Sequence, residues 1–323
     1  MSKTLGLDDY LKGIKNKDRT ILSRAITLIE STNPDHQKIS QELIKSILPQ
    51  TGRSKRIGIS GTPGVGKSTF IEAFGKLLTS KNKSVAVLAV DPTSKVSGGS
   101  ILGDKTRMNE LAVDPLAYIR PSPSVESLGG VAKRTREALL LCEAFGFDYV
   151  LVETVGVGQS ETTVSQMVDL FVMLLQPGAG DDLQGIKRGI LEVVDMVVVT
   201  KDDGDQQKII QKAKHDYQQA LQILRHDGRI PPVLTCSSIT KTGLPEIYSH
   251  IESYFIDQKE FILEKRNNQG LDWMWQLIQD GLKDLFKEEI GQDEIQEFES
   301  RILSNKHTPF EVASVLLKRF QKS

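Results

Sequence analysis

The sequence predicts an α/β fold in which a mainly parallel sheet is flanked by helices, with a helical arm before it and another after it. Between about residues 55 and 257, short runs rich in Val, Ile and Leu alternate with amphipathic helical segments. Continuous apolar runs of this kind are typical of strands that helices cover on both faces of a parallel sheet. Outside this region the apolar residues recur only at helical spacing.

These patterns divide the chain into three expected parts. The parts are an N-terminal helical extension over 1–52, a central α/β domain over 53–257 and a C-terminal helical arm over 258–323. The extension holds two or more helices, because its periodicity breaks at Thr32-Asn33-Pro34 and then resumes. The arm begins with one long helix or two over 258–286. Its last helix is indicated by Thr308-Pro309-Phe310-Glu311, a capping box with proline at the first helical position.

Within the central domain, seven runs have the length and composition of strands. They are Arg56–Ser60, Ser84–Val90, Ala117–Arg120, Tyr149–Glu153, Leu170–Leu175, Met196–Thr200 and Val233–Cys236. Between the last two, Lys208–Leu224 has an apolar face at helical spacing.

Composition excludes several classes of partner. A formal net charge of −1 creates no global field that would attract nucleic acid. The chain starts without an apolar signal segment, and no stretch approaches the length needed to span a bilayer. Cys142 and Cys236 lie far apart in apolar surroundings, which suits a reducing compartment. We therefore expect a cytoplasmic protein with no nucleic-acid or membrane partner.

The first strand candidate runs directly into a phosphate-binding motif, G-x-x-x-x-G-K-[ST]. The motif and the residue after it are Gly61, Thr62, Pro63, Gly64, Val65, Gly66, Lys67, Ser68 and Thr69. Its glycines let backbone N–H groups and the following helix N-terminus surround phosphate oxygens. Lys67 is expected to reach the β- and γ-phosphates, and Ser68 to bind Mg²⁺. The sequence therefore predicts a P-loop NTPase fold.

A second motif predicts which base is bound. Thr200-Lys201-Asp202-Asp203 follows a strand and fits the [N/T]-K-x-D pattern. We expect Asp203 to accept hydrogen bonds from guanine N1–H and N2, and the stem of Lys201 to flank the base. A charged turn is the alternative interpretation of this short motif taken alone. After the next strand, Ser237, Ser238 and Ile239 are expected to close over the base, which favours GTP and GDP.

Three carboxylates at or beyond strand ends are candidates for the Mg²⁺ shell together with Ser68. They are Asp91, Asp104 and Glu153. Hard oxygen donors of this kind suit Mg²⁺, although each could instead be a helix cap or a solvated turn residue. Arg107, near Asp104, is a candidate to stabilise charge on the phosphates.

The segment from Gln176 to Lys187 is long and rich in Pro and Gly for a simple connection. Loops of this length are often functional. We interpret it as a third switch that carries the nucleotide state to a partner, with Lys187 as a candidate catalytic cation.

Together these loops resemble the MeaB/ArgK family of GTPases, which is similar to the nickel-insertion and signal-recognition GTPases. The resemblance covers nearly the whole chain. It rests on 61–69, Val90-Asp91-Pro92-Thr93-Ser94, 98–108, 152–161, Gln176-Pro177-Gly178-Ala179-Gly180-Asp181-Asp182 and Trp273-Met274-Trp275. Thr200 and Ser238 depart from the asparagine and alanine that are more usual in the family.

The resemblance implies a GTP-hydrolysing chaperone of adenosylcobalamin-dependent methylmalonyl-CoA mutase, which gates cofactor loading and protects the mutase. It also implies a homodimer formed through the C-terminal arm. No glutamine stands out as a water-positioning residue, so we expect slow hydrolysis that accelerates when the mutase brings Lys187 or Arg107 inward.

Three alternatives remain at this point. A metal-insertion GTPase is disfavoured because the sequence has no His-rich tract and no paired cysteines. A small-molecule kinase, of the arginine/ornithine-transport kind, would need an acceptor pocket. An interaction module with a degenerate nucleotide site is disfavoured by the intact Lys67, Ser68 and Asp203.

Overall fold

The computed structural model describes residues 5–90, 108–121, 128–154, 160–177, 188–204, 207–224 and 228–321. The chain forms two compact units, Met1–Arg266 and Asn267–Ser323. The three-part division expected from the sequence stays a prediction. None of the helices built from the described residues is long and apolar enough to cross a membrane.

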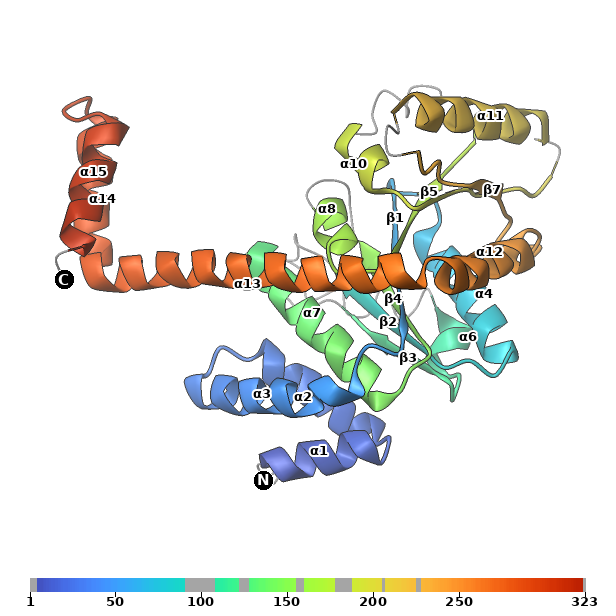
Figure 1. Cartoon of the computed structure of the whole chain (residues 1–323), viewed down its shortest axis with the longest axis horizontal. Coiled ribbons are helices and arrows are strands. Elements are labelled where there is room, and N and C mark those ends of the chain that lie inside the picture. The colour runs from blue at the N-terminus through green and yellow to red at the C-terminus, as the bar shows by residue number, and fades with distance from the viewer. Residues whose placement is uncertain are drawn as a thin grey trace. The chain divides into compact units, whose positions relative to one another are not determined.

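A seven-stranded sheet forms the centre of the first unit (Figure 1). Its strands are β1 (Lys55–Gly61), β2 (Val85–Val90), β3 (Ala117–Arg120), β4 (Tyr149–Thr154), β5 (Leu170–Leu175), β6 (Met196–Val199) and β7 (Val233–Thr235). Their order is β3-β2-β4-β1-β5-β6-β7, and every neighbouring pair is parallel. Each strand expected from the sequence is confirmed to within a residue at either end. The predicted fold class is therefore confirmed.

Helices cover both faces of this sheet, so alternate residues of each strand enter different cores. Tyr149 and Leu151 of β4 pack with the helices of one layer, and Val150 and Val152 pack with those of the other. The first layer comprises α4 (Lys67–Ser80), α6 (Asn109–Ala112) and α12 (Leu244–Asp257). The second comprises α7 (Leu128–Phe145), α8 (Ser160–Ser165), α10 (Arg188–Val193) and α11 (Gln207–Leu224). Burial of both faces explains why the strands read as continuous apolar runs.

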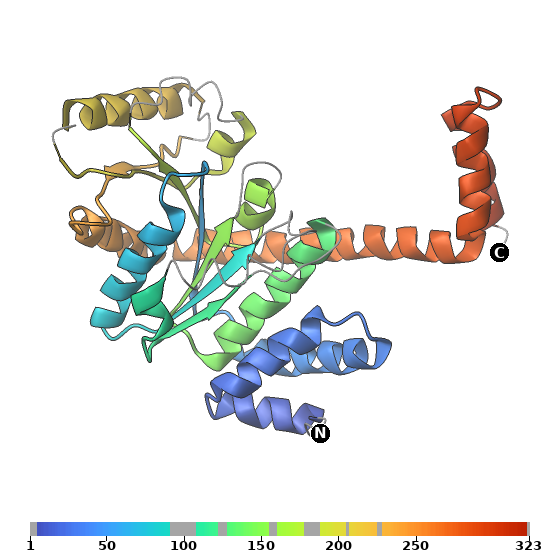
Figure 2. The ribbon, with the colours of Figure 1, turned by 180° about the vertical axis from the view of Figure 1, so that it is seen from behind.

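The N-terminal helices pack beside α7 and share its core (Figure 2). They are α1 (Leu7–Lys15), α2 (Arg19–Glu30) and α3 (Pro34–Ile47), followed by the short 3₁₀ turn η1 (Leu48–Gln50). Asp18 caps α2 by accepting from Thr20 N and Ile21 N, and Asn33 caps α3. These caps satisfy amide groups that a helix start would otherwise leave open. The helices expected in the N-terminal extension are therefore present.

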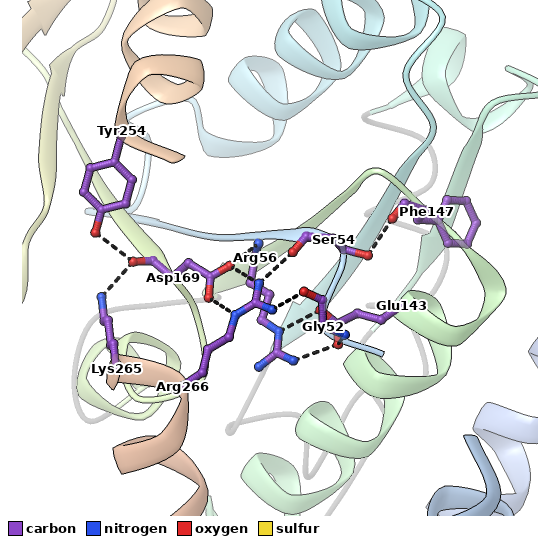
Figure 3. Close-up of polar contacts among 9 residues, drawn as sticks. All are labelled: Gly52, Ser54, Arg56, Glu143, Phe147, Asp169, Tyr254, Lys265 and Arg266. Carbon is purple, nitrogen blue, oxygen red and sulfur yellow. Dashed lines mark hydrogen bonds and ion pairs between the residues drawn. The ribbon is translucent and has the colours of Figure 1, made fainter. Parts of the chain in front are cut away.

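A buried carboxylate, Asp169, anchors the amino edge of the sheet, where β5 begins (Figure 3). Arg266 donates to it in a bidentate pair, from Nε to Oδ1 and from Nη2 to Oδ2, each at 2.6 Å. The backbone N–H of Arg56 donates to the same Oδ2 at 2.9 Å. Arg266 also donates to the carbonyls of Gly52 and Ser54. A single guanidinium thus joins β5 to the segment that leads into β1.

Two further carboxylates hold the start of β1 from opposite faces of the sheet. On the α7 face, buried Glu143 accepts from Arg56 Nε and Nη2 at 2.9 and 2.7 Å. On the α12 face, Glu252 pairs with Lys55 and accepts from the hydroxyl of Tyr149. Because successive strand residues point to opposite faces, Lys55 and Arg56 attach both helical layers to β1.

Over its described residues, 267–321, the second unit contains three helical segments. α13 (Lys259–Ile290) begins in the first unit and continues as one helix where the sequence allowed one or two. It is followed by α14 (Gln292–Leu303) and α15 (Pro309–Phe320). Thr308 Oγ1 accepts from Glu311 N, and the Glu311 carboxylate accepts from Thr308 N, which confirms the expected capping box. A small core of Phe298, Val312 and Leu316 joins α14 and α15.

Candidate nucleotide site

The motif residues that the structure describes converge on the carboxyl edge of the sheet, opposite the edge that holds Asp169. Because all strands are parallel, β1, β4, β5, β6 and β7 end at this same edge. β1 leads into the phosphate loop, and β4 carries Glu153 near its end. β5, β6 and β7 lead into Gln176, Thr200 and Cys236, respectively. Ligands of open α/β sheets bind at this edge. The sheet therefore brings together segments that are far apart in the sequence.

The phosphate loop connects β1 to the first turn of α4. Gly66 is the residue before that helix and has a φ of 98°, a left-handed conformation that favours glycine. A Cβ on Gly61 would lie 2.6 Å from the carbonyl oxygen of Leu174, so the loop approaches β5 closely. Val65 is fully buried in the core beneath the loop. The loop amides and the start of α4 thus form a fixed cradle for phosphate oxygens.

Two side chains within the loop can serve an anion. Lys67 Nζ donates to the carbonyls of Gly61 at 2.7 Å and Thr62 at 3.3 Å, which places the ammonium over the loop. Burial lowers the pKa of Lys67 below its usual value, and the charges of Glu153 and Glu161 oppose that shift. Within the described part of the chain, the buried Thr62 hydroxyl has no hydrogen-bond partner. Both groups fit a site for phosphate.

Ser68 and Glu153 form the part of the site suited to a metal. Ser68 Oγ donates to Glu153 Oε1 at 3.1 Å. The next residue, Thr154, donates from its hydroxyl to Ser60 Oγ at 2.8 Å and is fully buried, which fixes the ends of β4 and β1 together. A hydroxyl and a carboxylate are hard oxygen donors, so this pair fits Mg²⁺. Four other predicted site residues lie outside the described residues: Asp91, Asp104, Arg107 and Lys187.

The structure joins the predicted base motif directly to the phosphate loop. Thr200 Oγ1 lies 2.9 Å from the carbonyl oxygen of Val65 and 3.2 Å from that of Leu175. Lys201 Nζ donates to the carbonyl of Gly64 and to Gln176 Oε1, both at 3.0 Å. The hydroxyl of Thr200, where asparagine is more usual, therefore braces the loop from a buried position.

The loop after β7 lies next to this motif, because Asp202 N donates to the carbonyl of Cys236 at 3.0 Å. Ser237 Oγ accepts from the amides of Ile239 and Thr240, so it shapes the turn. Three more predicted base-site residues lie on these two loops: Asp203 and Ser238, partly buried, and Ile239, exposed. The base-reading roles of Asp203, Ser238 and Ile239 stay predictions.

Two residues of this site were not predicted to contact the nucleotide-binding lysines. Glu161, almost fully buried on α8, acts on Lys67 through its charge. Gln176 contacts Lys201, although only its place at the start of a long loop drew attention to it. Glu161 also belongs to a distinctive segment, 152–161, so a signal was present for both.

A phosphate loop after β1, an oxygen pair beside it and a base motif bonded to the loop define a P-loop NTPase of the guanine-nucleotide class. Comparison with known proteins makes this specific. The family model described as methylmalonyl Co-A mutase-associated GTPase MeaB matches residues 22–290. The chain belongs to this family and is a GTPase that binds guanine nucleotide.

Individual relatives agree with this assignment. The GTPase ArgK of Escherichia coli is 50% identical over 272 residues, covering 83% of this chain and 82% of the relative. The mouse protein named methylmalonic aciduria type A homolog, mitochondrial, is 43% identical over 333 residues, covering 98% of this chain and 80% of the mouse protein. A solved structure described as that of an LAO/AO transport system kinase has a TM-score of 0.78 at 36% identity and covers 99% of this chain and 100% of its own.

Proposed function

We propose that this GTPase is a chaperone that gates the loading of adenosylcobalamin into methylmalonyl-CoA mutase and protects the loaded mutase. The observation that carries the proposal is the family match over residues 22–290, because the family's description names the mutase. The mouse relative, named for methylmalonic aciduria, supports the same process. GTP binding and hydrolysis would then set when cofactor passes to the mutase.

Within this proposal, the predicted site residues have separate parts in nucleotide binding and hydrolysis. Lys67 and the loop amides stabilise the charge that develops on the phosphates. Ser68 and Glu153 hold Mg²⁺, together with Asp91 and Asp104, and the metal supplies charge neutralisation when bound. Asp203 reads guanine while Lys201 flanks it.

The metal assignment can be tested without measuring hydrolysis. Glu153→Gln keeps the shape of the side chain but removes its charge, so the Mg²⁺ concentration needed for tight GDP binding should rise about 10- to 100-fold. Ser68→Ala should act in the same direction. Glu246→Gln, at an exposed position on α12, is the control. An unchanged Mg²⁺ dependence in both site variants would refute the assignment.

For the switch, we propose that the mutase rearranges the segment from Gln176 to Lys187 and moves Lys187 or Arg107 toward the phosphates. Intrinsic hydrolysis is then slow and the partner accelerates it. Single-turnover GTP hydrolysis should be faster with mutase than without, and Lys187→Ala or Arg107→Ala should reduce the acceleration. Equal rates with and without mutase would rule out this mechanism.

We also propose that two copies associate through the C-terminal arm. The second unit has a small core, yet it exposes about half of Leu271, Trp275 and Leu282 on α13. Its helices also line a largely apolar groove of about 670 Å³. Exposed apolar surface of this kind usually marks a contact with another protein.

The oligomeric state tests this proposal. The chain should sediment as a dimer, and the double variant Leu271→Glu/Trp275→Glu should sediment as a monomer that keeps its nucleotide affinity. Gln279→Glu, at an exposed polar position on the same helix, should leave the dimer intact. A monomeric wild-type chain, or a dimer that survives the double change, would contradict the proposal.

A small-molecule kinase is the second candidate, because the solved relative at 36% identity is described as a kinase. The destination of the γ-phosphate separates the two. A chaperone GTPase releases labelled phosphate to water, whereas a kinase transfers it to arginine or ornithine. A metal-insertion GTPase would instead bind a transition metal stoichiometrically.

We propose a cytoplasmic location. Cys142 and Cys236 are both buried and not joined in a disulfide, in keeping with a reducing compartment. The mouse relative's name places that protein in mitochondria, so fractionation of cells producing this chain is the direct test.

A further inference from the structure

The ammonium of Lys201 is held between two segments that come from different strands. It donates to the carbonyl of Gly64 in the phosphate loop and to the side-chain oxygen of Gln176, which follows β5 directly. Lys201 itself is exposed and has a φ of 63°. An exposed lysine side chain therefore has both a constrained backbone and a constrained end.

These constraints matter because a free lysine samples many rotamers. Fixing such a side chain has an entropic cost, because its rotamer freedom is lost. The carbonyl of Gly64 is one acceptor for the ammonium, and Gln176 supplies a second. Together they leave the aliphatic stem in one place, where a planar base can pack on it without ordering the side chain first.

The position of Gln176 is itself determined by the sheet. Leu175, the last residue of β5, accepts from Thr200 N at 2.7 Å through its carbonyl. The end of β5 is thus hydrogen-bonded to the base motif immediately before Gln176. The side chain of Gln176, which is partly buried, starts from this fixed point and reaches Lys201.

We propose that Gln176 is a positioning residue for guanine nucleotides, which holds the Lys201 stem in the conformation that flanks the base. This inference rests on the proposed role of Lys201 in base binding. It adds that Gln176 acts only through Lys201. The same residue opens the segment from Gln176 to Lys187, so base binding and that segment share one side chain.

A double-mutant cycle tests the proposal. The variants are Gln176→Ala, Lys201→Ala and the double variant, and the measurement is the dissociation constant of a fluorescent GDP analogue. Loss of this exposed hydrogen bond should weaken GDP binding about 3- to 10-fold in Gln176→Ala, with a larger loss in Lys201→Ala. Because both act through one ammonium, the double variant should bind no more weakly than Lys201→Ala.

Two further measurements separate positioning from a merely structural role. Gln176→Ala should weaken the binding of inosine diphosphate (IDP), which lacks the N2 amine, by the same factor as that of GDP. The reason is that the Lys201 stem packs on the face of the base and does not contact the N2 amine. Gln176→Glu offers a charged acceptor at the same distance and should bind GDP at least as tightly as wild type. Gln219→Ala, at an exposed glutamine on α11, is the control and should change neither constant.

Several outcomes would overturn the proposal. Unchanged GDP affinity in Gln176→Ala would do so, as would losses that multiply in the double variant or a Gln176→Glu protein as weak as Gln176→Ala. If Lys201→Ala leaves GDP affinity unchanged, the assignment of Lys201 to the base site fails. This outcome is distinct from failure of the Gln176 proposal, because it occurs in a variant in which Gln176 is intact.

Discussion

The two edges of the sheet use the same kinds of charged residue in different ways. At the amino edge, Arg266 donates hydrogen bonds to the buried carboxylate of Asp169 and to two backbone carbonyls. Arg56 donates to the buried carboxylate of Glu143. At the carboxyl edge, Lys67 lies over loop carbonyls, with no carboxylate among its hydrogen-bond partners in the described residues.

This contrast separates charges that stabilise the fold from charges that serve a ligand. A guanidinium paired with a carboxylate in bidentate geometry has its charge neutralised and its direction fixed. An ammonium that burial destabilises, as the lowered pKa of Lys67 indicates, gains most when a negatively charged ligand arrives. The amino edge should therefore determine stability, and the carboxyl edge should determine catalysis.

The largest effect is expected from Asp169→Ala. Removing this carboxylate leaves the largely buried Arg266 guanidinium without its ion-pair partner, so the free energy of unfolding should fall by about 3–5 kcal/mol. Chemical denaturation measures this, and folded molecules should keep their GDP affinity. Glu297→Ala, in an exposed pair with Arg301, should cost only about 0.3–0.5 kcal/mol. Similar losses of unfolding free energy at the two positions would contradict the expectation that the buried ion pair stabilises the fold more than the exposed one.

Lys67→Met should lower catalysis and leave stability intact. Without the ammonium, the rate of single-turnover GTP hydrolysis should fall about 100- to 1,000-fold, because a charge aimed at the transition state is lost. The unfolding transition should not move to lower denaturant. Lys212→Met, at an exposed lysine on α11, is the matched control. A wild-type rate of GTP hydrolysis in Lys67→Met would show that Lys67 has no catalytic role.

A smaller effect is expected at Thr200, which belongs to the carboxyl edge but is buried. Thr200→Val removes the hydroxyl that contacts the carbonyl of Val65, so the GDP dissociation constant should rise about 2- to 10-fold. Thr200→Ser retains the hydroxyl and should bind as wild type does. Calorimetry with GDP distinguishes the two variants. Equal GDP affinities would mean that nucleotide binding does not depend on this contact.

The smallest effect concerns pH. Because burial lowers the pKa of Lys67, the native state binds fewer protons than the unfolded state between that lowered value and 10.5, the value in an unfolded chain. Wild-type stability should therefore rise relative to Lys67→Met as pH increases through this window. At pH 7 the variant should be at least as stable as wild type, and the gap should narrow toward pH 10. Denaturation curves from pH 7 to 10 would contradict this if the gap widened.

Much of the fold could be predicted because its signals are local. Each strand is a short apolar run, and the Thr308 box identifies a helix start within four residues. The two tight motifs, at 61–68 and 200–203, likewise need no long-range information. The continuity of α13 and the number of N-terminal helices were left open, and α14 was not predicted. Gly270 and Gly281 weaken the helical pattern of α13.

The amino-edge cluster could not be predicted in the same way. Arg266 and Asp169 are 97 residues apart, and Arg56 and Glu143 are 87 apart, with no periodicity that connects them. The bond from Thr200 to Val65 spans 135 residues and depends on where two strands end. Such pairings can be predicted only once the order of the strands is known.

The attachment of β1 on both faces has a mechanical consequence. Lys55 and Arg56 join its start to α12 and α7, and the backbone of Arg56 is bonded to Asp169. A strand held in this way at one end, with parallel neighbours along both sides, resists sliding along its own axis. The phosphate loop at its other end therefore has a fixed support, and cleavage of GTP should leave β1 in place.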